Sequence, residues 1–249
     1  MTSIPAVTAR QMAEVDRLMA SDFGVAPIQL MEVAGAAVAT FTRTFRADGD
    51  VAGQPIMALA GSGGNGGDAL VAARLLHAWG ARVTVVLSRP ADALTGLAAN
   101  HLHAVHRLGI DVLDGESLES LPKATVVIDG LLGFSATGAP RGTTARLIDM
   151  ANASSAPVLA IDLPSGLDPD TGVVAEPCIR ASATLTLGLP KLGLLAPQAA
   201  PWVGALTVAS IGVPAGAYRR VGVEVPDSLF ARASFLPVPL SHQEDSHDH

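Results

Sequence analysis

A glycine-rich segment in the first third of the chain carries side chains suited to binding a ligand. Residues 56–60 are apolar, residues 61–68 read Gly-Ser-Gly-Gly-Asn-Gly-Gly-Asp, and apolar residues then recur at helical spacing. This order predicts a buried strand, a tight turn and a helix. Such a unit binds phosphate in α/β proteins, because glycines let the backbone approach a ligand and a helix start presents free N–H groups.

Three interpretations of this turn stay open. Glycines at positions 61, 63 and 66 match the dinucleotide-binding pattern G-x-G-x-x-G. However, the next expected strand, residues 81–88, is followed by Arg89 and not by an acid that would hold a ribose, although an arginine could suit a 2′-phosphate. Asp68 at the helix start would also repel a phosphate. The turn could instead hold a cation or a polar ring through Asn65 and Asp68, or be a plain turn in which Asp68 is a cap.

Two other predicted strands end in aspartate. Residues 124–129 end at Asp129, and residues 157–162 end at Asp162, with Ser165 close behind. The carboxyl ends of parallel strands in an α/β sheet share one crevice, where ligands bind. One aspartate at a strand end is usually a turn former, but three polar strand ends at one edge predict a common site.

The elements that must position these residues alternate between strand and helix. The first helix is expected over residues 7–20, with Thr8 as N-cap and Gln11 completing a capping box. Further helices are expected at 30–41, 69–77, 92–108 and 143–153, and further strands near 112 and at 183–188 and 204–210. The alternation predicts a single α/β domain over residues 1–236, with a Rossmann-like, doubly wound, largely parallel sheet and helices on both faces. Residues 237–249, rich in histidine and acid, are expected to be a disordered tail.

Composition narrows the class of protein. The 249 residues are 49% hydrophobic, enough for one domain with a large core, and the net charge of −7 argues against nucleic acid or an anionic membrane as partner. No apolar run approaches the length of a membrane span, and the N-terminus lacks a secretory signal. The single Cys178 fits a reducing compartment, so a cytoplasmic protein is expected. The histidines at positions 101, 103 and 106 are expected on a solvated face, not at a metal.

Four motifs in a fixed order resemble the YjeF N-terminal domain family, the NAD(P)H-hydrate epimerases. They are LMEVAG from Leu30, GSGGNGGD from Gly61, IDLPSGLDPDTG from Ile161 and PKLGLL from Pro190, within roughly residues 7–214. The combination of D-x-P-S-G-x-D with an N-G-G-D turn is specific, unlike the glycine pattern alone. Asp129 and the loop that follows it also fit the family.

The resemblance implies an isomerase that interconverts the R and S forms of hydrated NADH and NADPH (NADHX and NADPHX). It would feed a dehydratase, expected to be a separate protein. The resemblance also implies a potassium ion bound by Asn65, Asp129 and Ser165, and oxygen ligands suit a hard cation. Asp162 is the candidate acid/base, and Lys191 matches a family lysine expected to be structural. The implied substrate contacts are Gly64, Asn65, Gly66, Gly67, Asp68, Gly133, Phe134, Ser135, Ala136, Thr137, Gly138, Ala139 and Asp162.

The loop of residues 133–139, with the hydroxyl groups of Ser135 and Thr137 and with Arg141 nearby, is a candidate phosphate cradle. The sequence departs from the family where Gly64 and Ala69 stand in place of the usual asparagine and glycine. Two alternatives remain: a non-catalytic binding or scaffold protein, which should have lost these site residues, and an NADP-dependent oxidoreductase that uses Arg89. A homodimer through the Ala/Gly-rich second helix is also expected.

Overall fold

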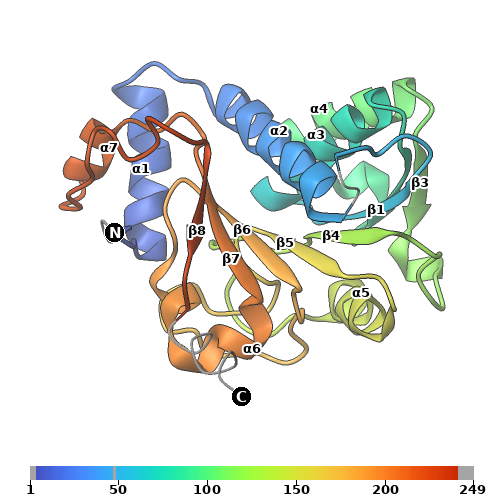
Figure 1. Cartoon of the computed structure of the whole chain (residues 1–249). Coiled ribbons are helices and arrows are strands. Elements are labelled where there is room, and N and C mark those ends of the chain that lie inside the picture. The colour runs from blue at the N-terminus through green and yellow to red at the C-terminus, as the bar shows by residue number, and fades with distance from the viewer. Residues whose placement is uncertain (1–3, 47–48, 241–249) are drawn as a thin grey trace.

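One mostly parallel sheet forms the centre of the protein (Figure 1). The computed structural model describes residues 4–46, except the side chain of residue 46, and residues 49–240. Within these ranges the sheet has eight strands in the order β3-β2-β1-β4-β5-β6-β7-β8, parallel except for the β7–β8 pair. The strands are β1 Pro55–Ala60, β2 Arg82–Leu87, β3 Asp111–Asp114, β4 Val126–Gly130, β5 Val158–Ile161, β6 Ala183–Leu187, β7 Ala205–Ala209 and β8 Phe235–Val238. The predicted doubly wound α/β sheet is confirmed.

Helices cover both faces of this sheet, with α2, α3 and α4 on one side and α5 on the other (Figure 1). The helices are α1 Ala9–Ser21, α2 Pro27–Arg46, α3 Gly64–Ala78, α4 Gly96–Arg107, α5 Gly142–Ala153, α6 Ala200–Val203 and α7 Ala215–Arg219. Short 3-10 turns lie at η1 Ala91–Ala93, η2 Gly115–Ser117, η3 Leu192–Leu195 and η4 Pro197–Ala199. Among the described helices, none combines the length and apolarity needed to cross a membrane.

The pleat of β1 explains the two-sided core. Ile56, Ala58 and Ala60 pack in one hydrophobic cluster with α2, α3 and α4. Met57 and Leu59 pack in the other cluster, with α5. Successive side chains of a strand point to opposite faces, so a central strand buried on both faces needs a continuous apolar run. The apolar run of residues 56–60 therefore fits a central strand, and the glycine turn that follows β1 lies at the edge of the sheet's middle.

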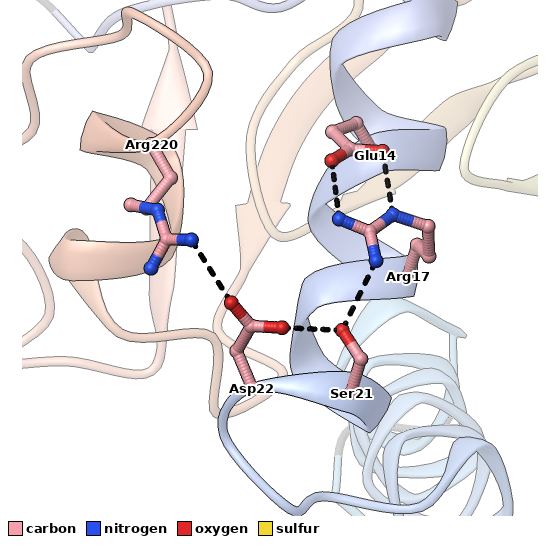
Figure 2. A network of polar contacts seen from close by, with 5 residues as sticks. All are labelled: Glu14, Arg17, Ser21, Asp22 and Arg220. Atoms are coloured by element: carbon pink, nitrogen blue, oxygen red, sulfur yellow. Dashed lines mark hydrogen bonds and ion pairs between the residues drawn. The ribbon is translucent and has the colours of Figure 1, made fainter.

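The first helix packs away from the sheet's central strands, next to α7 (Figure 1). It begins with the predicted capping box, in which Gln11 N–H donates to Thr8 Oγ1 (3.1 Å) and Thr8 N–H donates to Gln11 Oε1 (2.9 Å). At its other end Arg17 donates to Glu14 (2.7 and 2.9 Å), and Arg220 donates to Asp22 (2.9 Å) (Figure 2). This exposed network links the end of α1 to the residue that follows α7.

Several boundaries differ from the sequence predictions. The helix expected over 92–108 is divided into η1 and α4, because Leu94 and Thr95 are extended and a new helix begins at Gly96. His101 in α4 is buried, so the solvated face predicted for it is wrong. The strand β8 pairs with β7 through residues 235–238, so the tail predicted to begin at 237 starts inside a strand. Residues 239–240 follow without regular structure, and residues 241–249 of that tail lie outside the described residues.

Candidate functional site

The glycine turn after β1 is shorter than predicted. Only residues 61–63 form it, and α3 begins at Gly64 with Gly63 as its N-cap. A Cβ on Gly66 would lie 1.9 Å from the carbonyl oxygen of Gly61, so glycine permits this close approach. Asp68 is the fifth residue of α3, and the interpretation of Asp68 as a cap is therefore wrong.

Asn65 joins the ends of three neighbouring strands. Its Nδ2 donates to the carbonyl oxygens of Leu132 (2.9 Å) and Ile161 (2.8 Å), which follow β4 and end β5. The amide nitrogen is thus fully used, whereas Oδ1 accepts no hydrogen bond from the described residues. The side chain is buried and lies against Gly133, where a Cβ would come within 2.8 Å of Oδ1. Gly133 leaves room for the amide and keeps its oxygen available to a ligand.

Asp129 is a buried carboxylate with neutral hydrogen-bond donors. It is fully buried in β4, its Oδ1 accepts from Ser165 Oγ (2.7 Å) and Leu131 N–H (3.1 Å), and its Oδ2 accepts from Ser165 N–H (2.9 Å). No lysine, arginine or histidine within the described ranges forms an ion pair with it. Burial raises the pKa of Asp129 to about 6 despite these hydrogen bonds, because the charged form loses its hydration.

The three residues predicted to bind a metal ion meet around Leu132. Its carbonyl accepts from Asn65, and its N–H donates to Ser165 Oγ (2.9 Å), while Ser165 donates to Asp129. The group therefore combines an amide oxygen, a hydroxyl and one carboxylate without a cationic partner. Oxygen donors with a single negative charge fit a hard monovalent cation better than a transition metal.

Asp162 directly follows β5 and adopts an uncommon backbone conformation. Its φ of +67° lies in the left-handed region, which is unfavourable for a residue other than glycine and is often found at functional sites. Its Oδ1 accepts hydrogen bonds from Leu187 N–H (3.1 Å), Thr186 Oγ1 (3.2 Å) and Lys191 Nζ. In the part of the chain that the structure describes, Oδ2 has no such donor. One carboxylate oxygen is fixed, and the other is left for a ligand.

Lys191 is the cationic partner of Asp162. Both residues are at most 2% exposed, and Nζ also donates to the carbonyl oxygen of Leu187 (3.1 Å). The backbone on either side of Lys191 is anchored to Val7 by two hydrogen bonds of 2.9 Å: Val7 N–H donates to the Pro190 carbonyl, and Leu192 N–H donates to the Val7 carbonyl. Its ammonium lies 5.6 Å from the centre of the Phe134 ring. Lys191 was predicted to be structural, and the structure places its ammonium against the candidate catalytic group.

Two adjoining cavities open at this edge of the sheet. The first, which we call the aspartate pocket, measures about 200 Å³, and its polar wall includes Asp16, Asp68, Asp162 and Lys191. The second, the outer pocket, measures about 430 Å³ and is lined by hydroxyl groups and one arginine: Ser62, Ser88, Arg89, Ser135 and Thr144. Both are lined by Asp16, Gly64, Asn65 and Phe134, so they form one continuous site.

The aspartate pocket brings three carboxyl groups to one ammonium. The pKa of Asp68 is raised well above its usual range by burial and then by repulsion from Asp162 and Asp16. Burial is also the main cause that raises the pKa of Asp16 to about 6; Lys191 opposes the rise and Asp162 adds to it. Asp16 and Asp68 therefore bind a proton more readily in this pocket than they would in water.

The remaining predicted substrate contacts lie either on the loop after β4 or at the start of α3. On the loop after β4, Gly133, Ser135 and Ala136 line the outer pocket, and Gly138 lines a neighbouring cavity that Ser165 also lines. Thr137 and Ala139 are exposed on the same loop. Gly66 and Gly67 are buried packing positions: Gly66 lies against Gly61, and a Cβ on Gly67 would meet the Met31 sulfur at 2.5 Å.

Asp16 is a site residue that the motifs missed. It lies beside Met12 at the edge of the apolar stripe of α1, which also contains Val15 and Met19, and these three apolar residues are buried. A carboxylate on the apolar stripe of an amphipathic helix was the available signal, since charged residues normally face the solvent.

Comparisons with known proteins identify related sequences. Residues 27–193 match the family described as "YjeF-related protein N-terminus". The chain is 36% identical to an NAD(P)H-hydrate epimerase of Rhodopirellula baltica, covering 88% of this chain and 89% of that protein. It is 34% identical to an NAD(P)H-hydrate epimerase of Dehalogenimonas lykanthroporepellens, covering 97% and 96% of the two chains.

A longer relative and a solved structure extend this result. The bifunctional NAD(P)H-hydrate repair enzyme Nnr of Moorella thermoacetica is 42% identical over 84% of this chain, which spans only 40% of that protein's length. The crystal structure of the yeast protein YNL200c superposes with a TM-score of 0.80 at 26% identity, covering 94% of this chain and 100% of that chain.

Proposed function

The chain belongs to the family of YjeF-related N-terminal domains, and from this premise we propose that it is an NAD(P)H-hydrate epimerase. It would be an isomerase that interconverts the R and S forms of NADHX and NADPHX. The observation that carries this proposal is Asp162: one carboxylate oxygen is held by Lys191 and two other donors, and the residue lines a cavity beside the group formed by Asn65, Asp129 and Ser165.

The two cavities suit the two halves of a hydrated dinucleotide. We place the hydroxylated ring in the aspartate pocket, where Met31 and Phe134 offer apolar contact and Asp162 offers a proton acceptor. The phosphates would lie in the outer pocket, against Ser62, Ser135 and the start of α3, where hydroxyl and N–H groups bind anions. Arg89 lines this pocket, and its charge would favour a phosphate-bearing ligand.

Inversion of the hydroxyl-bearing carbon requires a group that takes and returns a proton beside that carbon. Either the hydroxyl leaves and returns, or the ring opens and closes again. In both routes Asp162 Oδ2 would exchange the proton, while Lys191 keeps the carboxylate in place through Oδ1. Phe134, Leu187 and Met12 are apolar residues of the pocket lining and would disfavour water beside the reacting carbon.

A potassium ion fits the group formed by Asn65, Asp129 and Ser165. Asp129 is buried without a cationic side chain, and Asn65 Oδ1 has no donor among the described residues. The ion would supply the positive charge that Asp129 lacks and would stiffen the loop that follows β4. The donors are all oxygen atoms, as a hard cation requires.

We also propose a separate dehydratase as the functional partner, in keeping with the bifunctional name of the longer relative. A homodimer would place α2, with exposed Ile28 and Val33, at the subunit interface. The cytoplasm, where reduced nicotinamide cofactors are used, would be its compartment. A scaffold protein without activity is disfavoured because Asn65, Asp129, Asp162 and Ser165 are all present and meet at one site.

The test is an assay with separated epimers. Purified protein is given one epimer of NADPHX, and the appearance of the other is followed by chromatography. Approach to the equilibrium mixture faster than the spontaneous inversion supports the proposal. Oxidation or reduction of a nicotinamide cofactor with a carbonyl substrate, without epimerisation, would support the oxidoreductase instead.

A further inference from the structure

The carboxylates of α1 lie in two different environments. Glu14 and Asp22 face the solvent side of the helix and are paired with Arg17 and Arg220 (Figure 2). Asp16 lies on the inner side, where it lines both the aspartate pocket and the outer pocket. It is therefore the residue of α1 whose charge is directed at the ligand site.

Nothing in its surroundings explains Asp16 as a structural residue. Within the described ranges its carboxylate accepts no hydrogen bond and forms no ion pair. The charged groups that influence it are Asp162, which repels it, and Lys191, whose Nζ is already bonded to Asp162. Asp68 lines the same pocket and is repelled by Asp16 in turn. A half-buried carboxylate beside two others lowers stability, and such groups are kept mainly at functional sites.

The structure nevertheless holds α1 firmly against the site. Residue Val7, just before the helix, forms backbone hydrogen bonds with residues 190 and 192, on either side of Lys191. Gln11 Nε2 donates to the carbonyl oxygen of Val221, behind α7 (3.1 Å). Asp16 is thus positioned by the same segment that positions the partner of Asp162.

From these contacts we propose that Asp16 is a second catalytic residue, which exchanges a proton with the substrate hydroxyl from the α1 wall while Asp162 acts from the sheet. This inference rests on the proposed function. Because the two carboxyl groups reach the pocket from different elements, each can serve a different position of the hydroxyl group during inversion. A single group would have to serve both.

In one direction of the inversion, proton transfer begins at Asp16. Protonated Asp16 donates its proton to the hydroxyl, the C–O bond breaks and its electron pair leaves with water, and the lone pair of the ring nitrogen forms a C=N bond. A water molecule then bonds to the other face of the same carbon as Asp162 Oδ2 accepts its proton, and the C=N electrons return to nitrogen. The reverse direction exchanges the two roles, and the pKa of Asp16 near 6 allows it to hold or release a proton near neutral pH.

The experiment compares Asp16→Asn with the wild type and with Glu14→Gln, a matched change on the exposed side of the same helix. We expect kcat for epimerisation to fall about 100-fold in Asp16→Asn, with KM changed less than about threefold, because general acid–base groups contribute on this scale. The fall in wild-type kcat as pH rises through the Asp16 pKa should disappear in this variant. Its melting temperature should be equal or higher, since a repulsive charge is removed. Glu14→Gln should match the wild type throughout.

Asp16→Glu provides the second variant, because it restores a carboxyl group one methylene longer, and it should recover more kcat than Asp16→Asn. An Asp16→Asn protein with kcat within threefold of the wild type, or with the wild-type pH profile, would overturn the inference while the proposed function stands. A lower melting temperature in Asp16→Asn, together with a kcat per folded molecule and a pH profile equal to those of the wild type, would assign Asp16 a structural role. Absence of epimerisation in the wild type would remove both proposals.

Discussion

Two aspartates at adjacent strand ends, Asp129 of β4 and Asp162 after β5, are both buried but have different partners. Asp162 is paired with Lys191, and one of its oxygens remains without a donor from the described residues. Asp129 has hydrogen bonds to both oxygens, yet all of its donors are neutral. Asp162 therefore has a balancing charge but an incomplete set of hydrogen bonds, whereas Asp129 has hydrogen bonds to both oxygens but no balancing charge.

This difference indicates what each aspartate lacks. A buried carboxylate without an opposite charge nearby tends to take up a proton, so a cation bound from solution would stabilise the ionised form of Asp129. A carboxylate with a free oxygen at a cavity can exchange a proton with a ligand. One edge of the sheet thus provides a cation site and a proton-transfer site within neighbouring strands, at the point where the strand order reverses between β1 and β4.

The strongest expected effect comes from Asp162→Asn. The amide cannot accept the substrate proton, and we expect kcat to fall about a thousandfold, within the range for acid–base groups. Substrate affinity, measured by calorimetry with one epimer, should change little. Epimerisation near the wild-type rate with normal binding would show that Asp162 is not the proton-exchanging group.

Lys191→Met tests the other half of the same pair. Removing the ammonium leaves Asp162 buried without its ion-pair partner, and breaking such pairs costs about 3–5 kcal/mol of the free energy of unfolding. Urea unfolding should show this loss. The double variant Lys191→Met with Asp162→Asn should be more stable than Lys191→Met alone, and additive losses would argue against a coupled pair.

Potassium should stabilise the protein through Asp129. At a potassium concentration about tenfold above Kd, the free energy of unfolding should rise by about 1.4 kcal/mol, measured against choline chloride of equal ionic strength. Asp129→Asn should abolish this rise, whereas Asp162→Asn should retain it. Equal stabilisation of the two variants would mean that the ion binds elsewhere.

The potassium effect should depend on pH with a definite sign. The folded-state pKa of Asp129 is raised from 3.8 to about 6, so its contribution to stability without potassium is present at low pH and is lost as pH rises through about 6. Potassium binds the ionised form. The difference in melting temperature with and without potassium should therefore be small at pH 5 and grow by pH 7.5. A difference that is constant over this range would exclude Asp129 as the linked group.

The exposed network at the end of α1 supplies the smallest expected change (Figure 2). Arg220→Ala removes the hydrogen bond to Asp22, and exposed ion pairs contribute about 0.2–1 kcal/mol. Thermal unfolding in low and high salt should show a small loss that salt reduces. A loss above about 2 kcal/mol would mean that this network, and not the backbone bonds of Val7, holds α1 in place.

Much of this architecture could be predicted from the sequence because it follows local patterns. Apolar runs marked β1, β4 and β5, the Thr8–Gln11 pair marked the start of α1, and the parallel arrangement then required Asp129 and Asp162 to share an edge. The start of α3 at Gly64 was missed because glycines disfavour helices, and here close packing against Gly61 and Met31 outweighs that preference. The burial of His101 and the approach of Asp16 to Asp162 depend on helix packing, which no local pattern reveals.

The most direct measurement is the rate at which one purified epimer of NADPHX is converted to the other, with wild-type protein and Asp162→Asn side by side in potassium buffer. We predict rapid approach to the same equilibrium mixture from either epimer with the wild type, and conversion close to the spontaneous rate with the variant. Equal rates for the two proteins, or no acceleration by the wild type, would contradict it.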